Sequence, residues 1–192
     1  MTESRVTPAR LEAISDGVIA VAITIMVLGL RPPRTGSTGE LLALWPQFVI
    51  YLVSFTSLAV YWVNHRYLFG HLRRVDERVL WTNMAVLFLL SPIPFATAYA
   101  AQTGLSALSV AFFAGVMVLA GLGFGGLAFG IKAQYPPGEA PAAFSGGQQA
   151  IHFAGLSAYA LAIPVAFASA LASLALILAV SALYITRLTR PE

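Results

Sequence analysis

The sequence contains no cysteine and very few charged residues. Of its 192 residues only 10% are Asp, Glu, Lys or Arg, whereas 58% are hydrophobic. Without cysteine the chain has no disulfide, no zinc–thiolate site and no cysteine nucleophile. A soluble domain carries roughly 25% charged residues, so these few charges cannot cover a water-facing surface. The composition therefore predicts an all-α integral membrane protein.

Missing motifs exclude further classes. The sequence has no GxSxG nucleophile motif and no TVGYG potassium filter. Its net charge of +3 does not predict nucleic-acid binding, because the basic residues lie between apolar segments rather than in one patch. The glycines of GLGFGG (residues 121–126) follow an apolar run rather than a soluble strand, so they predict helix packing instead of a dinucleotide turn.

Six apolar segments are present, and a spanning helix needs about 20 such residues. We expect helices at about 11–30, 41–63, 79–101, 106–131, 149–167 and 169–186. The first begins with charges and is long enough to span, so we expect a retained helix rather than a cleaved signal. Only a weak signal separates the last two segments, and one long helix there would leave five spans. No linker divides the chain, so residues 1–192 read as a single domain.

The basic residues favour six spans over five. With both termini inside, nine Lys and Arg residues lie on the inner side and two on the outer side. Five spans would change the distribution to seven inside and four outside. Cytoplasmic loops carry the excess of basic residues in membrane proteins, so we expect six helices with both termini cytosolic. The inner set is Arg5, Arg10, Arg66, Arg73, Arg74, Arg78, Lys132, Arg187 and Arg190, and the outer set is Arg31 and Arg34.

Asp16 is an acidic residue within the first apolar segment. An ionisable group in a span is costly, so it faces a bundle interior or water. We expect Asp16 and the adjacent Ser15 to form a structural anchor near the inner interface, and a direct role in ion or proton passage stays open. The expected partners, at a similar depth, are Asn64, His65, Arg66 and Asn83.

The first apolar segment has one hydroxyl near its middle, that of Thr24, and this hydroxyl lies on a stripe of apolar residues. Val21, Thr24 and Leu28 share a helix face, and Ile14 and Gly17 extend that face inward. Such a stripe is most often ordinary lipid or helix contact. If several copies of the helix met on an axis, it would form apolar rings with one hydroxyl ring between them. A constriction of this kind gates by dewetting.

Two other function classes remain open. His65 and His71 are six residues apart, so they cannot share a helix face as i and i+4 metal ligands do. An intramembrane enzyme or haem protein would use Asp16, His65 and His152. A small secondary transporter would use a broken helix, which Pro92 and Pro94 would mark.

The first segment also resembles a known channel signature. Arg10, Ile14-Ser15-Asp16, Ile23-Thr24 and Leu28 are similar to the RxxxFSD pattern in the first helix of the transmembrane protein 175 family, which comprises lysosomal potassium channels and short prokaryotic relatives. Trp62-Val63-Asn64-His65 and the stretch LWTNMAVLFLLSPIPFATA (residues 80–98) add to this resemblance. The motifs cover roughly the first hundred residues.

The resemblance implies a homotetramer of six-helix subunits whose first helices line a central pore. Val21 and Leu28 match the bulky apolar ring positions, and Thr24 matches a threonine that contributes to potassium preference. A hydrogen-bond network is implied for the signature and its neighbours, which are Arg10, Ser15, Asp16, Asn64, His65 and Asn83. No cofactor, metal or nucleic acid is implied, and potassium is the permeant ion.

Two departures change what we expect of this member. Ile14 replaces the aromatic residue of the signature, and Val21 is smaller than the Ile or Leu common at the narrow ring. Either Val21 or Leu28 then forms the narrowest ring. We expect a potassium-permeable channel, not an enzyme, in the plasma membrane of a prokaryote. Proton conduction is the related alternative.

Overall fold

A bundle of long helices makes up the protein in the computed structural model, which describes residues 6–188. No strand occurs in that range. The elements in chain order are α1 (Pro8–Leu28), α2 (Thr38–Ala43), α3 (Trp45–Phe69), α4 (Glu77–Leu90), α5 (Ile93–Gln102), α6 (Ala107–Lys132), the 3-10 turn η1 (Ala142–Phe144), α7 (Gly146–Ala168) and α8 (Ala170–Leu188). The expectation of an all-α membrane protein is confirmed.

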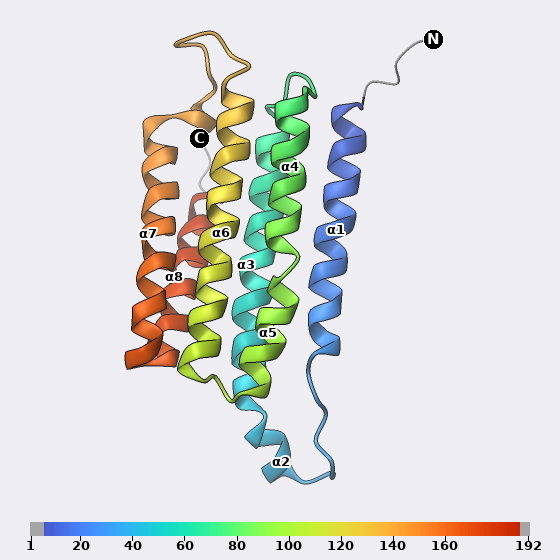
Figure 1. The fold of residues 1–192 in the computed structure, drawn as a ribbon, viewed down its shortest axis with the longest axis vertical. Coiled ribbons are helices and arrows are strands. Elements are labelled where there is room, and N and C mark those ends of the chain that lie inside the picture. The colour runs from blue at the N-terminus through green and yellow to red at the C-terminus, as the bar shows by residue number, and fades with distance from the viewer. Residues whose placement is uncertain (1–5, 189–192) are drawn as a thin grey trace.

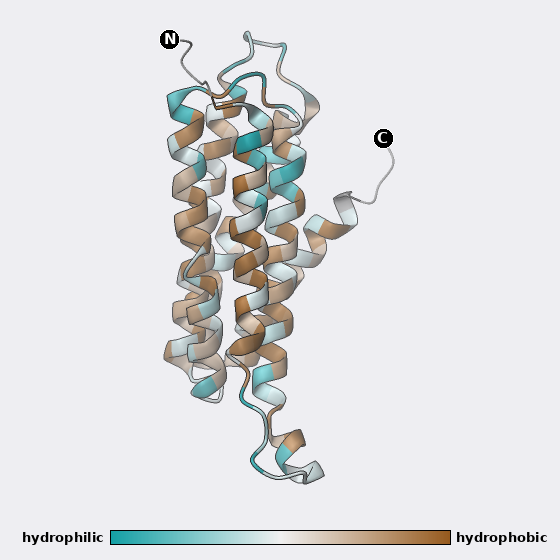
Figure 2. Cartoon of the chain, turned by 90° about the vertical axis from the view of Figure 1, so that its right-hand side faces the viewer, coloured by the Kyte–Doolittle hydropathy of each residue, from teal (hydrophilic) through white to brown (hydrophobic). Residues whose placement is uncertain are grey.

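Five stretches are long and apolar enough to cross a bilayer among the described residues. They are Pro8–Leu28, Trp45–Phe69, Glu77–Gln102, Ala107–Lys132 and Gly146–Ala168. The apolar part of α8, Ala170–Thr186, is shorter. Apolar residues occupy the middle of the bundle and hydrophilic ones its two ends, and the last turns of α8 diverge from the other helices (Figure 2). The count of six spans stays a prediction.

The second apolar segment is two helices rather than one, so its expected start at residue 41 is wrong. Ser37 caps the short α2 by accepting a hydrogen bond from the backbone N–H of Glu40. The chain then turns at Leu44, and α3 begins at Trp45 with a proline in its first turn. The Glu40 carboxylate accepts a 2.8 Å hydrogen bond from the Thr35 N–H, which holds the Glu40 pKa below its usual value. Local capping thus separates α2 from the spanning helix.

The third segment is broken at Ser91-Pro92, between α4 and α5. Proline has no backbone N–H, so Pro92 cannot donate to the carbonyl of Phe88 one turn earlier. The Ser91 hydroxyl makes that bond instead, at 2.8 Å. Thr97 similarly donates to the Ile93 carbonyl at 2.8 Å. The Ser91 side chain therefore satisfies the backbone carbonyl that Pro92 leaves without its helical donor.

The boundary between the last two segments falls at Ser169. Its backbone is extended, with φ −159° and ψ 113°, and its hydroxyl accepts from the Ala172 N–H at the start of α8. A single long helix is thus wrong for this region. Arg5 and Arg190 lie outside the described residues, as does the placement of the Arg187 side chain.

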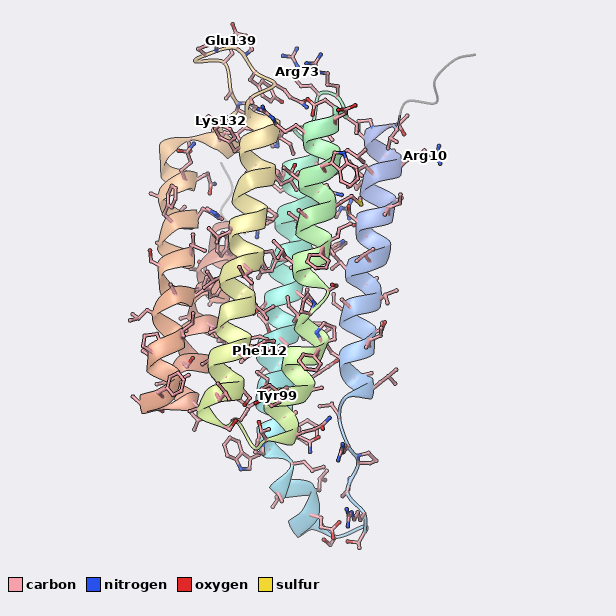
Figure 3. All side chains as sticks on the ribbon, in the orientation of Figure 1. Arg10, Arg73, Tyr99, Phe112, Lys132 and Glu139 are labelled. Atoms are coloured by element: carbon pink, nitrogen blue, oxygen red, sulfur yellow. The ribbon has the colours of Figure 1, made fainter. Side chains whose placement is uncertain are left out.

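Basic residues expected on the inner side gather at one end of the bundle. Arg10, Arg73 and Lys132 lie at that end (Figure 3). Arg31 is at the opposite end, where its backbone N–H donates to Gln47 at 2.9 Å and its side chain donates to Gln102 at 3.2 Å. The charge separation agrees with the predicted topology, but which end faces the cytosol stays a prediction.

The long loop after α6 is fixed to the loop between α3 and α4 by Gln134. Its side-chain oxygen accepts from the backbone N–H groups of Arg73 and Arg74, at 3.2 Å each. Its amide nitrogen donates to the carbonyl of Arg74 and to the carboxylate of Asp76. Tyr135 adds a 2.6 Å hydrogen bond to the carbonyl of His71. One glutamine thus holds two loops together.

The helices are arranged with α1 at one edge of the bundle and α7 and α8 at the other (Figure 1). The neighbours of α1 are α3, α4 and α5. The remaining helices, α6, α7 and α8, pack on the far side of α3 and α4, with α6 against α7 as the most extensive contact. Much of α1 therefore has no covering helix among the described residues.

The glycines of α6 lie against different neighbouring helices. A methyl group added at Gly125 would lie 2.7 Å from Nε2 of His152 on α7, and one at Gly121 would lie 3.2 Å from Leu156. At Gly130 the nearest neighbours are Arg78 and Thr82 of α4, both at 3.7 Å. A methyl group at Gly126 would meet nothing within 4 Å. Close helix approach thus needs Gly121 and Gly125 but not Gly126.

Adjacent glycines on α6 allow a matched stability test. Gly126→Ala should raise the unfolding temperature in detergent, because alanine in an exposed helix is favoured over glycine by up to about 1 kcal/mol. Gly125→Ala should lower it, because displacing His152 costs about 1–3 kcal/mol of overpacking. Thermal unfolding followed by circular dichroism measures both. Equal increases for the two variants would contradict the close α6–α7 contact.

Candidate functional site

Helix α1 has two different faces. Its buried face consists of residues that pack against α3, α4 and α5, namely Leu11, Ser15, Ile19, Ala22 and Met26. Their spacing of three or four residues places them on one side of the helix. The five residues of the stripe predicted from sequence, Ile14, Gly17, Val21, Thr24 and Leu28, are all exposed. The helix thus presents the stripe away from its own bundle.

The exposed stripe is apolar except for one hydroxyl. Leu28 is 81% exposed, Val21 55% and Ile14 52%, so these side chains are left to contact lipid or a neighbouring subunit. Thr24 donates its hydroxyl hydrogen to the carbonyl of Val21 at 3.0 Å. The oxygen of this exposed residue can still act as an acceptor. The stripe therefore combines apolar bulk with a single oxygen acceptor.

Three of the predicted network residues form one hydrogen-bonded chain near the N-terminal end of α1. Nε2 of His65 on α3 lies 2.8 Å from Oδ1 of Asn83 on α4. The Asn83 amide donates to the Ser15 hydroxyl at 2.9 Å, and Ser15 donates to the carbonyl of Leu11 at 2.9 Å. All three side chains are 0% or 1% exposed. This chain connects α1, α3 and α4.

Asp16 has a different partner from those expected. Its carboxylate accepts a 2.8 Å hydrogen bond from the indole nitrogen of Trp62, rather than from Asn64 or His65. The Asn64 amide instead donates to the carbonyl of Val60 on its own helix. Trp62 was missed as a network residue, although an indole N–H in a span needs an acceptor. Asp16 and Trp62 form a second link between α1 and α3.

Among residues 6–188 no hydrogen bond joins the Arg10 side chain to the network. Arg10 is exposed, and its backbone N–H donates to the hydroxyl of Thr7, the helix cap. Arg66 pairs with Glu12 at 3.7 Å, and its guanidinium lies 5.4 Å from the ring centre of Trp62. The Glu12–Arg66 pair is partly exposed, so it contributes at most about 1 kcal/mol.

The middle and C-terminal parts of α1 are also held on the bundle. Met26 contacts the Thr97 hydroxyl at 3.7 Å, and Thr97 lies 2.7 Å from the Ser54 hydroxyl. A methyl group added at Gly29 would lie 3.3 Å from Cβ of Ala98, so α1 and α5 approach closely there. With the Arg31 contacts at the end, these interactions anchor α1 along its whole length.

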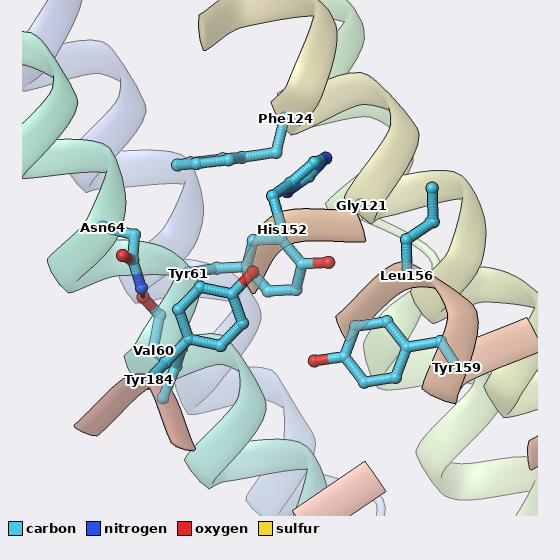
Figure 4. A pocket seen from close by; sticks show the side chains of 9 residues that line it. All are labelled: Val60, Tyr61, Asn64, Gly121, Phe124, His152, Leu156, Tyr159 and Tyr184. Atoms are coloured by element: carbon cyan, nitrogen blue, oxygen red, sulfur yellow. Dashed lines mark hydrogen bonds between the residues drawn. The ribbon is translucent and has the colours of Figure 1, made fainter. Parts of the chain in front are cut away.

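The structure separates the residues that an enzyme or haem site would need. His152 lines a pocket of about 30 Å³ between α3, α6, α7 and α8 (Figure 4). His65 instead is hydrogen-bonded in the network with α1 and α4. Three tyrosines, Tyr61, Tyr159 and Tyr184, line the same pocket. Such a volume is on the order of one or two water molecules. Among the described residues no three His, Asp or Glu side chains gather as a metal site would need.

Comparisons with known proteins place these features in a family. Residues 10–94 match the sequence model of the endosomal/lysosomal potassium channel TMEM175. A protein from Streptomyces collinus named potassium channel is 35% identical over 179 residues, which cover 86% of this chain and 85% of that protein. A Chryseobacterium protein with the same name is 46% identical over 91 residues, 47% of each chain. The match thus spans about half the length of that second relative.

A vertebrate relative carries a different name. The endosomal/lysosomal proton channel TMEM175 of Danio rerio is 26% identical over 118 residues, which cover 59% of this chain and 23% of that protein. The fold resembles a crystal structure of a lysosomal potassium-selective channel TMEM175 homolog from Chamaesiphon minutus, with a TM-score of 0.83 and 26% identity over 95% of this chain and 98% of that one. The matched signature, the near full-length relative and the shared fold agree, and the chain belongs to the TMEM175 family.

Proposed function

We propose that this chain is one subunit of a homotetrameric, potassium-permeable cation channel whose central pore is lined by α1. The observation that carries the proposal is the division of α1 into an anchored face and an exposed stripe. The bundle holds the helix rigidly at Ser15, Met26 and Arg31, so the stripe at Val21, Thr24 and Leu28 has a fixed position. Relatives named potassium channel support the permeant ion.

The stripe accounts for a gated, selective pathway. Four copies around an axis place rings of Val21 and Leu28 on either side of a ring of Thr24. Apolar rings exclude water when narrow and so form a gate. Because the Thr24 hydrogen is directed to Val21, the four Thr24 oxygens direct lone pairs toward the axis, where they replace part of the water around a cation. Val21 and Leu28 form the constriction, and Thr24 contributes selectivity.

Passage is passive in this proposal. Potassium moves down its electrochemical gradient through the plasma membrane of a prokaryote, and no cofactor or covalent step is involved. Both termini and the basic end of the bundle face the cytosol, as the excess of Lys and Arg predicts. The apolar outer surface of the tetramer contacts the lipid bilayer.

Proton conduction is a second candidate, favoured by the name of the Danio rerio relative. Asp16 is the residue to test, because it is a carboxylate within α1 next to the exposed stripe. Its hydrogen bond from Trp62 directs the carboxylate toward α3, which favours an anchoring role. The transporter alternative rests on the break at Pro92, where Ser91 satisfies the backbone locally. Saturable, coupled flux would distinguish a transporter from a channel.

Flux through liposomes tests the pore residues directly. We expect purified protein in liposomes to pass potassium passively. Leu28→Ala should increase the flux, because a smaller apolar ring widens the constriction. Thr24→Ala should reduce the preference for potassium over sodium, because it removes the only oxygen of the stripe. Fluorescent potassium and sodium indicators inside the liposomes measure the flux and the ion preference. If neither variant differed from the wild type, a pore along α1 would be contradicted.

Val21 is tested by enlarging it. Val21→Leu should lower conductance or sharpen selectivity, because four larger side chains narrow the ring. Val27→Leu is a matched control, since Val27 is exposed on another face of the same helix. Single-channel recording in planar bilayers measures both variants. Equal effects at the two positions would remove Val21 from the constriction.

The absence of native cysteine allows a direct test of the tetramer. Leu28→Cys should form disulfide-linked dimers on mild oxidation in the membrane, because equivalent residues of symmetric copies meet at the axis. Leu161→Cys is the control, being 56% exposed on α7, which does not pack against α1. Non-reducing gel electrophoresis measures the products. Cross-linking at Leu161 but not at Leu28 would contradict the proposed arrangement.

A further inference from the structure

His65 has one buried ring nitrogen without a partner in the described part of the chain. The side chain is 1% exposed and stacks on Phe69, with 4.1 Å between ring centres. Nε2 of the ring contacts Asn83, whereas Nδ1 is buried and makes no hydrogen bond within residues 6–188. Buried polar atoms are nearly always paired, so an unpaired one in a network of this kind calls for a chemical explanation.

The direction of the network fixes where the ring carries its hydrogen. The Leu11 carbonyl can only accept, so Ser15 directs its single hydrogen to Leu11. The Ser15 oxygen is then an acceptor for the amide nitrogen of Asn83. This places the amide oxygen of Asn83 toward His65, so Nε2 of His65 must be the donor. In the neutral ring Nδ1 therefore carries a lone pair and no hydrogen.

Two carboxylates of α1 pair with residues that lie within one turn of His65 on α3, Glu12 with Arg66 and Asp16 with Trp62. The carboxylates of Glu12 and Asp16, both on α1, act electrostatically on the ring. From α4 the ring meets the neutral amide of Asn83. On its own helix the adjacent Arg66 is directed to Glu12 and to the face of Trp62. A positive charge on the ring would thus be attracted to two carboxylates on α1.

We propose that Nδ1 of His65 is a regulatory proton-binding site that couples pH to the position of α1. Proton binding breaks no hydrogen bond of the neutral network, because Nε2 keeps its hydrogen and Asn83 keeps its acceptor. It does create a buried N–H that needs an acceptor, since an unpaired buried donor is costly. Carboxylate oxygens on α1 can supply that acceptor, and Asp16 must then reorient relative to Trp62.

The site is distinct from the pathway itself. His65 is covered by α1 and α4, on the side of α1 opposite the exposed stripe. A proton there would not be a permeating ion. It would alter the link through Ser15 that holds α1, and so alter the pore. The effect on flux rests on the proposed function, whereas the protonation of the ring does not.

Nuclear magnetic resonance of the histidine nitrogens tests the site independently of transport. The chain has only three histidines, so protein labelled with ¹⁵N-histidine in liposomes gives few signals, and His65→Gln identifies those of His65. At about pH 8 we expect a protonated Nε2 and a bare Nδ1. On acidification to about pH 4.5, across the usual histidine range, Nδ1 should gain a proton. A hydrogen on Nδ1 at high pH, or no protonation on acidification, would overturn the proposal.

Potassium flux at controlled pH tests the coupling. Between about pH 8 and pH 4.5 we expect wild-type potassium flux to change by at least about fivefold, as ordinary coupling energies give. The pH dependence should fit the binding of a single proton. In His65→Gln the amide can still donate to Asn83 but cannot titrate, so this one-proton dependence should disappear. His152→Gln, in the distant pocket, should retain it. If flux through His65→Gln still depended on pH as in the wild type, the proposed coupling would be overturned. If the wild type passed no potassium at all, the proposed function would be overturned. The nitrogen resonances of His65 would still decide whether Nδ1 binds a proton.

Discussion

The hydrogen-bonded chain from His65 through Asn83 to Ser15 is the interaction on which the arrangement of the bundle depends. Within a bilayer no water is present to satisfy a displaced polar group, and each unsatisfied group costs several kcal/mol. Sliding α1 by even one residue would move Ser15 away from Asn83 and leave buried donors and acceptors unpaired. The network therefore fixes the register of α1 against α3 and α4, which apolar packing alone leaves adjustable.

This anchoring explains why the opposite face of α1 can remain apolar and uncovered. Lipid does not drive apolar faces together as water does, so a helix needs specific contacts to hold its position. Ser15, the Asp16–Trp62 bond, Met26 and the Arg31 contacts provide these on one side only. The exposed side of α1 then holds Val21, Thr24 and Leu28 in a fixed orientation. Symmetry-related copies can use that side as a common lining.

Features that depend on hydropathy or on single helices could be predicted from sequence. The length of the apolar runs predicted the spanning helices, and helical spacing placed the stripe of α1 on one exposed face. The predicted start of the second helix at residue 41 was wrong because Ser37 and Glu40 cap a separate short helix before Pro46. Apolar composition cannot show such a turn, since both helices are hydrophobic.

Contacts between helices were harder to predict, because they depend on the depth of each helix in the bundle and on its rotation about its own axis. Ser15, His65 and Asn83 were expected together and do form a network, but Asp16 pairs with Trp62 rather than with Asn64. Asn64 follows Trp62 by two residues and so points elsewhere around α3. The glycine pattern of α6 had the same limit, because spacing alone does not distinguish Gly125, which meets His152, from the open Gly126. The loop contacts of Gln134 have no signal in the sequence.

The central claim, that the exposed face of α1 lines the ion pathway, is tested most directly by thiol accessibility. The cysteine-free chain allows one cysteine at a time to be placed along residues 14–28 and treated with a charged, water-soluble thiol reagent during potassium flux. The account predicts block at positions 14, 17, 21, 24 and 28 and none at the buried positions 15, 19, 22 and 26. Block that does not follow this three- and four-residue spacing, or modification of the stripe without loss of flux, would contradict it.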